Sequence, residues 1–294
     1  MENDMTRPFI GPGDEEGRPD RMNGTLGHNE KITPSAYATA MSVRDILEKH
    51  RKGEIDASEA ERLLRLDYVR KIGEHTLFDT RRAERKGVPE IIYGESKSAD
   101  TVVDIIEGAL ADKEVLLVSR SSPQQFEAVR SRVPEARYEE RARMIVVDRR
   151  KEHDAIGLIG VLTAGSSDIA AAEEARVVAE SMGCRVLTAY DVGIAAFHRF
   201  IEPLHRMLEE GVDALIVVAG MEGALASVVS SLADVPVIGV PTSVGYGVGE
   251  GGRAALSSML QSCSPGLVAV NIDNGVGAGI TAALISLRCR RSQH

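Results

Sequence analysis

The residues best suited to bind a ligand stand in short polar loops that follow apolar runs. Gly165-Ser166-Ser167-Asp168 comes directly after the apolar run 156–163. Glycine lets the backbone approach a ligand closely, and serine hydroxyls donate hydrogen bonds. A helix that follows presents free N–H groups and its positive dipole end. This pattern favours a phosphate-binding loop, and a helix cap formed by Ser167 or Asp168 is the alternative.

Polar residues also follow the next three apolar runs. They are, in chain order, Asp191, His198, Gly220, Glu222, Thr242 and Ser243. A histidine near a helix start can bind an anion or move a proton, although a lone histidine is more often structural. Glu222 stands at the start of an expected helix, where the dipole stabilises a carboxylate. At the mouth of a site the same carboxylate would serve as a general base.

Cys263 is a candidate nucleophile in an awkward position. A free cysteine is usually a buried, inert side chain. Cys263 follows the helix expected after the fourth apolar run and precedes the fifth. This order places it near the opposite edge of the sheet from the other motifs. A catalytic role would require an irregular loop or a neighbouring subunit to bring the thiol to the site.

Five short apolar runs alternate with helical segments in the second half of the chain. The runs are 156–163, 185–189, 214–219, 235–240 and 267–272. The alternation predicts an α/β fold with a doubly wound parallel sheet of about five strands and right-handed crossovers. Ligands bind outside the carboxyl ends of the strands in such sheets. The polar strand ends taken together therefore favour one site.

Three parts follow one another along the chain. Residues 1–40 are rich in Gly, Pro, Asn, Asp and Glu, which predicts a disordered tail. Residues 41–150 predict a small helical and α/β domain, and residues 151–294 the domain with the parallel sheet. Ser58 and Glu61 fit a capping box in the small domain. Its expected helices begin at Ser42 and cover 57–66, 102–110 and 123–133, and its expected strands are 91–93, 115–118 and 145–147.

Composition argues against several classes of protein. The chain has 294 residues, of which 43% are hydrophobic, so a substantial core can form. Its net charge of -9 argues against a nucleic-acid-binding surface. No apolar run approaches the roughly 20 residues that span a bilayer, and the N-terminus lacks a signal-peptide pattern. Three cysteines are a poor disulfide framework. We expect a cytoplasmic protein without nucleic-acid or membrane partners.

A dinucleotide-binding Rossmann domain is disfavoured. The first strand is not followed by G-x-G-x-x-G, although Asp191 stands where a ribose-binding acid would lie. The glycines Gly245, Gly247, Gly249 and Gly251 follow the fourth strand, which is the wrong place for this fingerprint.

Several motifs resemble those of the LarB family, whose fold is similar to that of PurE, the aminoimidazole ribonucleotide carboxylase. The chain has GSSD, YDVGIAAFHR, AGMEGALASVV, VPTSVGYG, SC and NIDNGVGAG. The family pattern is GTSD, YDVGVAGxHR, AGMEGALPSVV, VPTSVGYG, SC and NIDNGFGA. The departures, at Ser166, Ala196, Ala226 and Val276, remove no polar or nucleophilic group. Upstream, FDTRRAERKGVPEIIYG also resembles the family, so the resemblance covers nearly all of the chain after the tail.

The resemblance implies a PurE-like catalytic domain and a carboxylation. LarB enzymes carboxylate the pyridinium ring of nicotinic acid adenine dinucleotide and cleave its phosphoanhydride. The products, AMP and pyridinium-3,5-biscarboxylic acid mononucleotide, belong to nickel-pincer cofactor biosynthesis. By its match to the family, Cys263 would be the nucleophile that adds to the ring. Glu222 would take the ring proton or orient water.

The resemblance also implies substrate-binding residues and partners. The residues are Gly165, Ser166, Ser167, Asp168, Asp191, His198, Gly220, Thr242, Ser243, Arg81 and Arg82. Carbon dioxide or bicarbonate would be the second substrate. Magnesium would assist the anhydride step, with no evident cluster of metal ligands and no organic cofactor. A homo-oligomer, from dimer to octamer, is expected because PurE-fold enzymes share sites between subunits.

Two other functions stay open. A PurE-like carboxylase or mutase would act on an aminoimidazole ribonucleotide and would not need Cys263. A non-catalytic nucleotide-binding module would use the same loops and would bind its ligand unchanged after Cys263→Ser.

Overall fold

The computed structural model describes residues 43–66, 69–72, 76–79, 86–111, 113–151 and 155–291. The predicted disordered tail, residues 1–40, lies outside this range, as do Arg81 and Arg82. No helix in the described part is both long and apolar enough to cross a bilayer.

Two helices open the described chain, α1 (Val43–Arg51) and α2 (Ala57–Leu66). Both were expected, but the predicted capping box of Ser58 and Glu61 is wrong. Asp56 precedes α2, and its Oδ1 accepts the backbone N–H three residues further on at 2.7 Å. Aspartate satisfies a free N–H at this position, so the helix begins before Ser58.

The small domain contains a mixed sheet with the order β3-β4-β6-β5. Strands β3 and β4 are parallel, and the other two pairs are antiparallel. Helices α4 and α5 pack on one face of this sheet in a shared buried cluster. The bounds are β3 (Glu90–Tyr93), α4 (Ala99–Ala109), β4 (Val115–Ser119), α5 (Pro123–Arg132), β5 (Arg137–Glu139) and β6 (Met144–Asp148).

The expected strands and helices of this domain are confirmed, and three further strands were not predicted. They are β5 and an antiparallel pair, β1 (Val69–Ile72) and β2 (Thr76–Asp79). Each has only three or four residues, so its hydrophobic pattern is too short to stand out from a loop.

The second domain contains a five-stranded sheet with the order β11-β10-β9-β7-β8. All four neighbouring pairs are parallel, which confirms the predicted doubly wound fold. Only the last strand is clearly shorter than its apolar run. The bounds are β7 (Gly157–Thr163), β8 (Cys184–Ala189), β9 (Ala214–Ala219), β10 (Val237–Pro241) and β11 (Leu267–Ala269).

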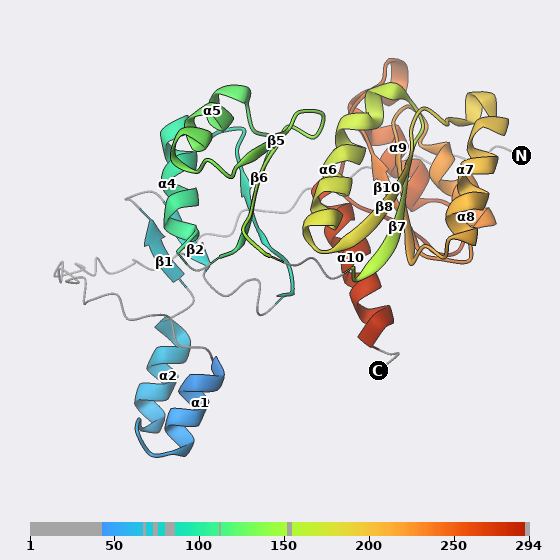
Figure 1. The fold of residues 1–294 in the computed structure, drawn as a ribbon. Coiled ribbons are helices and arrows are strands. Elements are labelled where there is room, and N and C mark those ends of the chain that lie inside the picture. Colours follow the sequence, from blue (N-terminus) through green and yellow to red (C-terminus); the bar gives the residue numbers. More distant parts are fainter. Residues whose placement is uncertain are drawn as a thin grey trace, which may run out of the picture. The chain divides into compact units, whose positions relative to one another are not determined.

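Helices cover both faces of this sheet (Figure 1). Alternate side chains of β9 point to opposite faces, so Ile216 packs with α6 and α10 while Leu215 packs with the other helices. The strand is buried throughout because both faces are covered. The bounds are α6 (Ile169–Ser181), α7 (His198–Glu209), α8 (Ala224–Leu232), α9 (Arg253–Leu260) and α10 (Gly275–Arg291).

The strand order reverses direction at β7. From β7 the chain goes to β8 on one side and then crosses to β9 on the other. The carboxyl ends of β7 and β9 therefore form the topological switch point, where α/β sheets bind their ligands.

Candidate functional site

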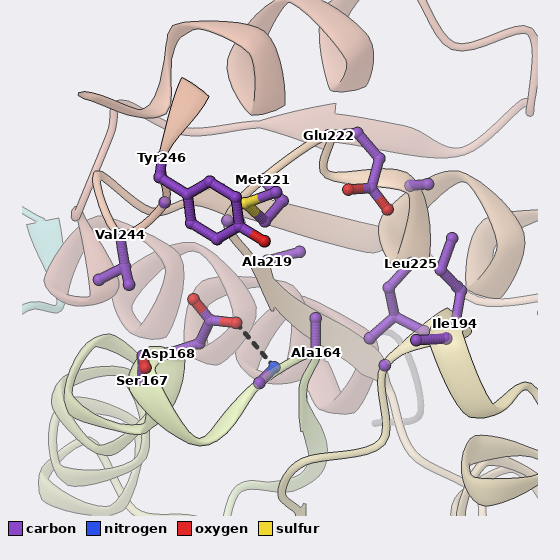
Figure 2. A pocket seen from close by; sticks show the side chains of 16 residues that line it. Ala164, Ser167, Asp168, Ile194, Ala219, Met221, Glu222, Leu225, Val244 and Tyr246 are labelled. Carbon is purple, nitrogen blue, oxygen red and sulfur yellow. Dashed lines mark hydrogen bonds between the residues drawn. The ribbon is translucent and has the colours of Figure 1, made fainter. Parts of the chain in front are cut away.

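A cavity of about 590 Å³ opens at this switch point. Its walls come from the segments 164–168, 193–195, 219–225 and 244–246, which follow β7, β8, β9 and β10. Four strand ends thus meet in one cavity, whose volume suits a small-molecule ligand. Figure 2 shows Asp168, Glu222 and Tyr246 on different parts of its wall.

Gly220 lets the loops after β9 and β10 approach each other. A Cβ atom at this position would lie 2.3 Å from the carbonyl oxygen of Val244 and 2.7 Å from Oγ1 of Thr242. Any side chain would displace the Val244 loop, so glycine is required for the closed wall.

Asp168 ties two strand ends together. Its Oδ2 accepts the Gly165 N–H at 2.8 Å (Figure 2), and its Oδ1 accepts the Thr242 hydroxyl at 2.6 Å. Burial raises the pKa of Asp168, while these hydrogen bonds act in the opposite direction. The carboxylate is 5% exposed. Asp168 thus stabilises the loop as a helix cap would. Both of its carboxylate oxygens already accept hydrogen bonds, so a ligand that contacts them would share them with Gly165 and Thr242.

Five predicted site residues line the large cavity. They are Gly165, Ser167, Asp168, Gly220 and Glu222. Glu222 is exposed and lines the cavity, as a general base at the mouth of a site would. Ser166 is exposed in the short 3-10 helix Ser166–Asp168 and does not line the cavity.

Thr242 and Ser243 line a second, smaller cavity of about 200 Å³ beside the first. Ser167 and Val244 line both cavities. The small cavity also contains Arg120, whose guanidinium donates to the carbonyl oxygen of Asp273 at 3.0 Å. This bond joins the end of β4 to the loop after β11.

Glu174 on α6 is the most perturbed carboxyl of the small cavity. Burial raises its pKa to about 7, although Arg120, 4.0 Å away, acts in the opposite direction. Asp273 and Glu95 raise the pKa further, and Arg143 lowers it. The small cavity therefore holds a carboxyl that changes its charge near neutral pH.

Asp191 and His198 lie beside the large cavity but do not line it. Asp191 forms an ion pair with Arg199, whose guanidinium donates to Oδ2 at 3.0 Å, and the Asp191 backbone N–H donates to Oγ1 of Thr163. His198 is the exposed first residue of α7 and follows the wall segment 193–195. Arg199 was not predicted, and it is the cation that lies closest along the chain to this wall.

Cys263 is exposed and lies at the amino ends of the strands. It stands between α9 and β11, and the Ser264 hydroxyl next to it donates to the carbonyl of Ser227 at 2.9 Å. Strand β11 begins beside the start of β10, with Leu267 paired to Val237. The cavity opens beyond the other end of β10. Cys263 therefore lies before the start of β11, and it is not among the residues that line the cavity.

The apolar part of the cavity wall was not predicted. It contains Ile194, Met221, Leu225, Val244 and Tyr246. The signal that the sequence offers is an aromatic residue between glycines directly after a strand end, in VGYGVG.

Backbone strain is concentrated at the two cavities. Within the described residues, five non-glycine positions have φ between 49° and 56°. Met221 lines the large cavity, Arg120, Arg143 and Asp273 line the small one, and Asp191 precedes the wall segment 193–195. Such conformations cost about 1–3 kcal/mol each and cluster at functional sites, which supports both cavities as parts of a site.

No group of three or more His, Cys, Asp or Glu side chains gathers as a metal site in the described chain. A magnesium ion carried by substrate phosphates needs only one or two protein carboxylates. Asp168 and Glu222 are the two carboxylates that line the cavity. The oxygens of Asp168 already accept from Gly165 and Thr242, so Glu222 is the residue that would contact such an ion.

The fold and cavity are those of a PurE-family, carboxylase-like protein. The AIR carboxylase family model matches residues 158–291, and the LarB/PurE-like N-terminal domain matches residues 69–150. An uncharacterized protein from Methanocaldococcus jannaschii is 41% identical over 253 residues, which cover 83% of this chain and 97% of that protein. The chain belongs to the LarB family and has a PurE-like C-terminal domain.

More distant relatives match the second domain. The N5-carboxyaminoimidazole ribonucleotide mutase of Methanocaldococcus jannaschii is 30% identical over 126 residues, 42% of this chain and 76% of the mutase. That of Thermotoga maritima is 30% identical over 134 residues, 43% of this chain and 73% of the mutase. A crystal structure of a Treponema denticola PurE2 variant is 21% identical, with a TM-score of 0.34, and covers 46% of this chain and 91% of that one.

Proposed function

We propose that this protein carboxylates the pyridinium ring of nicotinic acid adenine dinucleotide. It also cleaves the phosphoanhydride of this substrate, which gives AMP and pyridinium-3,5-biscarboxylic acid mononucleotide. Carbon dioxide, free or from bicarbonate, is the second substrate. The proposal places the chain in nickel-pincer cofactor biosynthesis, in the cytoplasm.

The observation that carries this proposal is an exposed free thiol in a PurE-like protein. Cys263 is exposed and stands in the SC motif that resembles the LarB family. An aminoimidazole ring is electron-rich and attacks carbon dioxide without help. A pyridinium ring is electron-poor and needs a nucleophile to add first. An enzyme for the second substrate therefore requires a thiol that an enzyme for the first does not.

The carboxylation proceeds in three steps, and hydrolysis of the phosphoanhydride consumes one water in addition. The Cys263 thiolate forms a C–S bond to the ring, which becomes a neutral dihydropyridine with enamine character at the neighbouring carbon. That carbon attacks carbon dioxide and forms the new C–C bond. Glu222 accepts the proton from the same carbon, and the electron pair of this C–H bond restores the aromatic ring as the C–S bond breaks and the thiolate leaves. The ring gains a carboxylate and loses one proton.

The proposal includes a second copy of the chain as the source of the thiol. Within one chain Cys263 precedes β11 and does not line the cavity, so we propose a homo-oligomer in which one copy's Cys263 enters the cavity of another. Exposed apolar side chains near Cys263 support such a contact, since they are 52–69% exposed on adjacent elements. They are Leu232, Leu260 and Val268.

The remaining predicted residues have binding roles in this proposal. The loop of Ser166, Ser167 and Asp168 faces phosphate or ribose, with Gly165 and Gly220 allowing close approach. Asp191, His198, Thr242 and Ser243 form the outer contacts. Arg81 and Arg82 would add positive charge near the substrate anions. Magnesium on the anhydride oxygens would neutralise charge during hydrolysis, next to Glu222.

The test is product formation by purified protein from nicotinic acid adenine dinucleotide, bicarbonate and magnesium, followed by mass spectrometry. We expect AMP and the dicarboxylated mononucleotide from wild type, and no carboxylated product from Cys263→Ala. Carboxylated product from Cys263→Ala would remove the thiol from its role. Turnover of an aminoimidazole ribonucleotide instead would favour the activity named for the mutase relatives.

Mixing two inactive variants tests whether the site is shared. Cys263→Ala keeps the cavity, and Glu222→Gln keeps the thiol. Mixed oligomers of the two should regain part of the wild-type rate, because some sites combine an intact Glu222 with an intact Cys263. Each variant mixed with wild type serves as the control for subunit exchange. No recovery in exchanging oligomers would contradict a shared site.

A further inference from the structure

Tyr246 is a large aromatic side chain left mostly in water at the wall of the cavity. It is 79% exposed, although tyrosine usually buries most of its ring. It stands between Gly245 and Gly247, whose φ angles are 156° and 77°. These glycines present the ring on a loop that an ordinary residue would form only with strain. The packing of the free protein does not use this ring.

The residues beside Tyr246 form an apolar rim. Met221 is 44% exposed and Val244 is 45% exposed, and both line the same cavity. A Cβ atom at Gly245 would lie 3.4 Å from the sulfur of Met221, so the loop of Tyr246 runs against this side chain. In the view of Figure 2 the ring of Tyr246 overlaps Met221, and its hydroxyl points toward the middle of the cavity. These side chains offer apolar surface to a ring that enters the cavity.

The charges of the wall favour a cation at this surface. Asp168 and Glu222 are its ionisable acids, and no lysine, arginine or histidine occurs among the described residues that line the cavity. The face of a phenol ring is also electron-rich and attracts cations within about 6 Å. A neutral aromatic ring would gain the apolar contact alone, whereas a positively charged ring gains both.

We propose that Tyr246 is the residue that recognises the positive charge of the substrate ring. Its phenol stacks on an N-substituted pyridinium and selects this aromatic cation over a neutral ring of the same shape. The inference rests on the proposed function for the identity of the ring. It adds a specificity residue that the polar strand ends did not reveal.

The experiment compares two ligands that differ mainly in ring charge. Nicotinamide mononucleotide carries a pyridinium, and its 1,4-dihydro form has the same heavy atoms and a neutral ring. The dissociation constants of both are measured by calorimetry with wild type, Tyr246→Phe and Tyr246→Leu. Leucine keeps an apolar side chain without a π face, and phenylalanine keeps the face without the hydroxyl.

We expect wild type to bind the cation more tightly than the neutral form. Tyr246→Leu should reduce this preference by about 3- to 30-fold, which corresponds to cation–π energies of about 0.6–2 kcal/mol. Tyr246→Phe should retain most of it. Equal thermal midpoints of the three proteins will show that the exposed substitutions leave the fold intact.

An unchanged preference in Tyr246→Leu overturns the inference, as does a wild type that binds both forms equally or binds neither. The carboxylation assay is read separately. If the preference depends on Tyr246 but no carboxylated product forms, the inference about Tyr246 stands and the proposed reaction is refuted. If the product forms but Tyr246→Leu still prefers the cationic ligand to the same extent, the proposed reaction stands and the inference about Tyr246 is refuted.

Discussion

Neighbouring carboxylates on α6 should respond to pH in opposite directions. Burial raises the pKa of Glu174 from 4.5 to about 7. Burial also acts to raise the pKa of Glu173, but the hydrogen bonds from Arg176 and Tyr190 outweigh it, so this pKa lies below its usual range. Two adjacent positions on one helix therefore provide a perturbation and its matched control.

The sign of each effect follows from linkage. Because the folded pKa of Glu174 lies above the unfolded value, folded protein binds more protons between pH 4.5 and about 7, and stability falls across this window. The full difference corresponds to about 3 kcal/mol above pH 7. For Glu173 the folded pKa is lowered, so its stabilisation is present above pH 4.5 and is lost as pH falls through the folded pKa.

The assay is thermal unfolding of wild type, Glu174→Gln and Glu173→Gln between pH 4 and pH 8. Glutamine imitates the protonated acid, so Glu174→Gln should match wild type near pH 4. Above pH 7 it should be more stable by about 3 kcal/mol, which is roughly 6–12 °C for a protein of this size. Glu173→Gln should be less stable than wild type at pH 8 and approach it in acid. A stability difference for Glu174→Gln that does not grow with pH would refute the reasoning.

Gly220→Ala and Thr242→Val test contacts at the walls of the two cavities, with Gly165→Ala as a control. Gly220→Ala should displace the loop of Val244, destabilise the protein by about 1–3 kcal/mol and lower carboxylation about 100-fold. Gly165→Ala is the control for stability, since its Cβ would meet Asp168 Oδ2 at an ordinary 3.5 Å; equal losses of stability of the two variants in urea unfolding would contradict this. Thr242→Val should cost about 1–3 kcal/mol, because buried Asp168 loses a donor. A urea midpoint equal to that of wild type would show that the hydroxyl is dispensable.

The sequence predicted the elements of the second domain because each is long and periodic. The runs that became β7, β9 and β10 contain five to seven strand residues that are almost all buried, whereas β8 at the sheet edge is only partly buried. Apolar runs of this length can be recognised without tertiary information. The chain order of these runs also predicted that Cys263 lies away from the polar strand ends. The pairing of Leu267 with Val237 agrees with this placement.

Features that depend on distant contacts could not be predicted. The small cavity requires the contact of Arg120 with Asp273, which are 153 positions apart. Tyr246 becomes a candidate only when its loop is seen against Met221. Strand β5, Arg137–Glu139, exists because it pairs with β6 across a turn in which Arg143 is left-handed. Each needs a partner that no local pattern identifies.

The acidic wall of the large cavity has a consequence for the end of the catalytic cycle. In the proposed reaction the ring enters as a cation with one carboxylate and leaves with a second one. The wall that attracts the entering ring contains Asp168 and Glu222 and, in its described part, no basic side chain. Its attraction therefore weakens as the new carboxylate forms. The negative charge of the wall therefore favours binding of the substrate ring over the product ring. We expect the product to bind weakly and to cause little product inhibition.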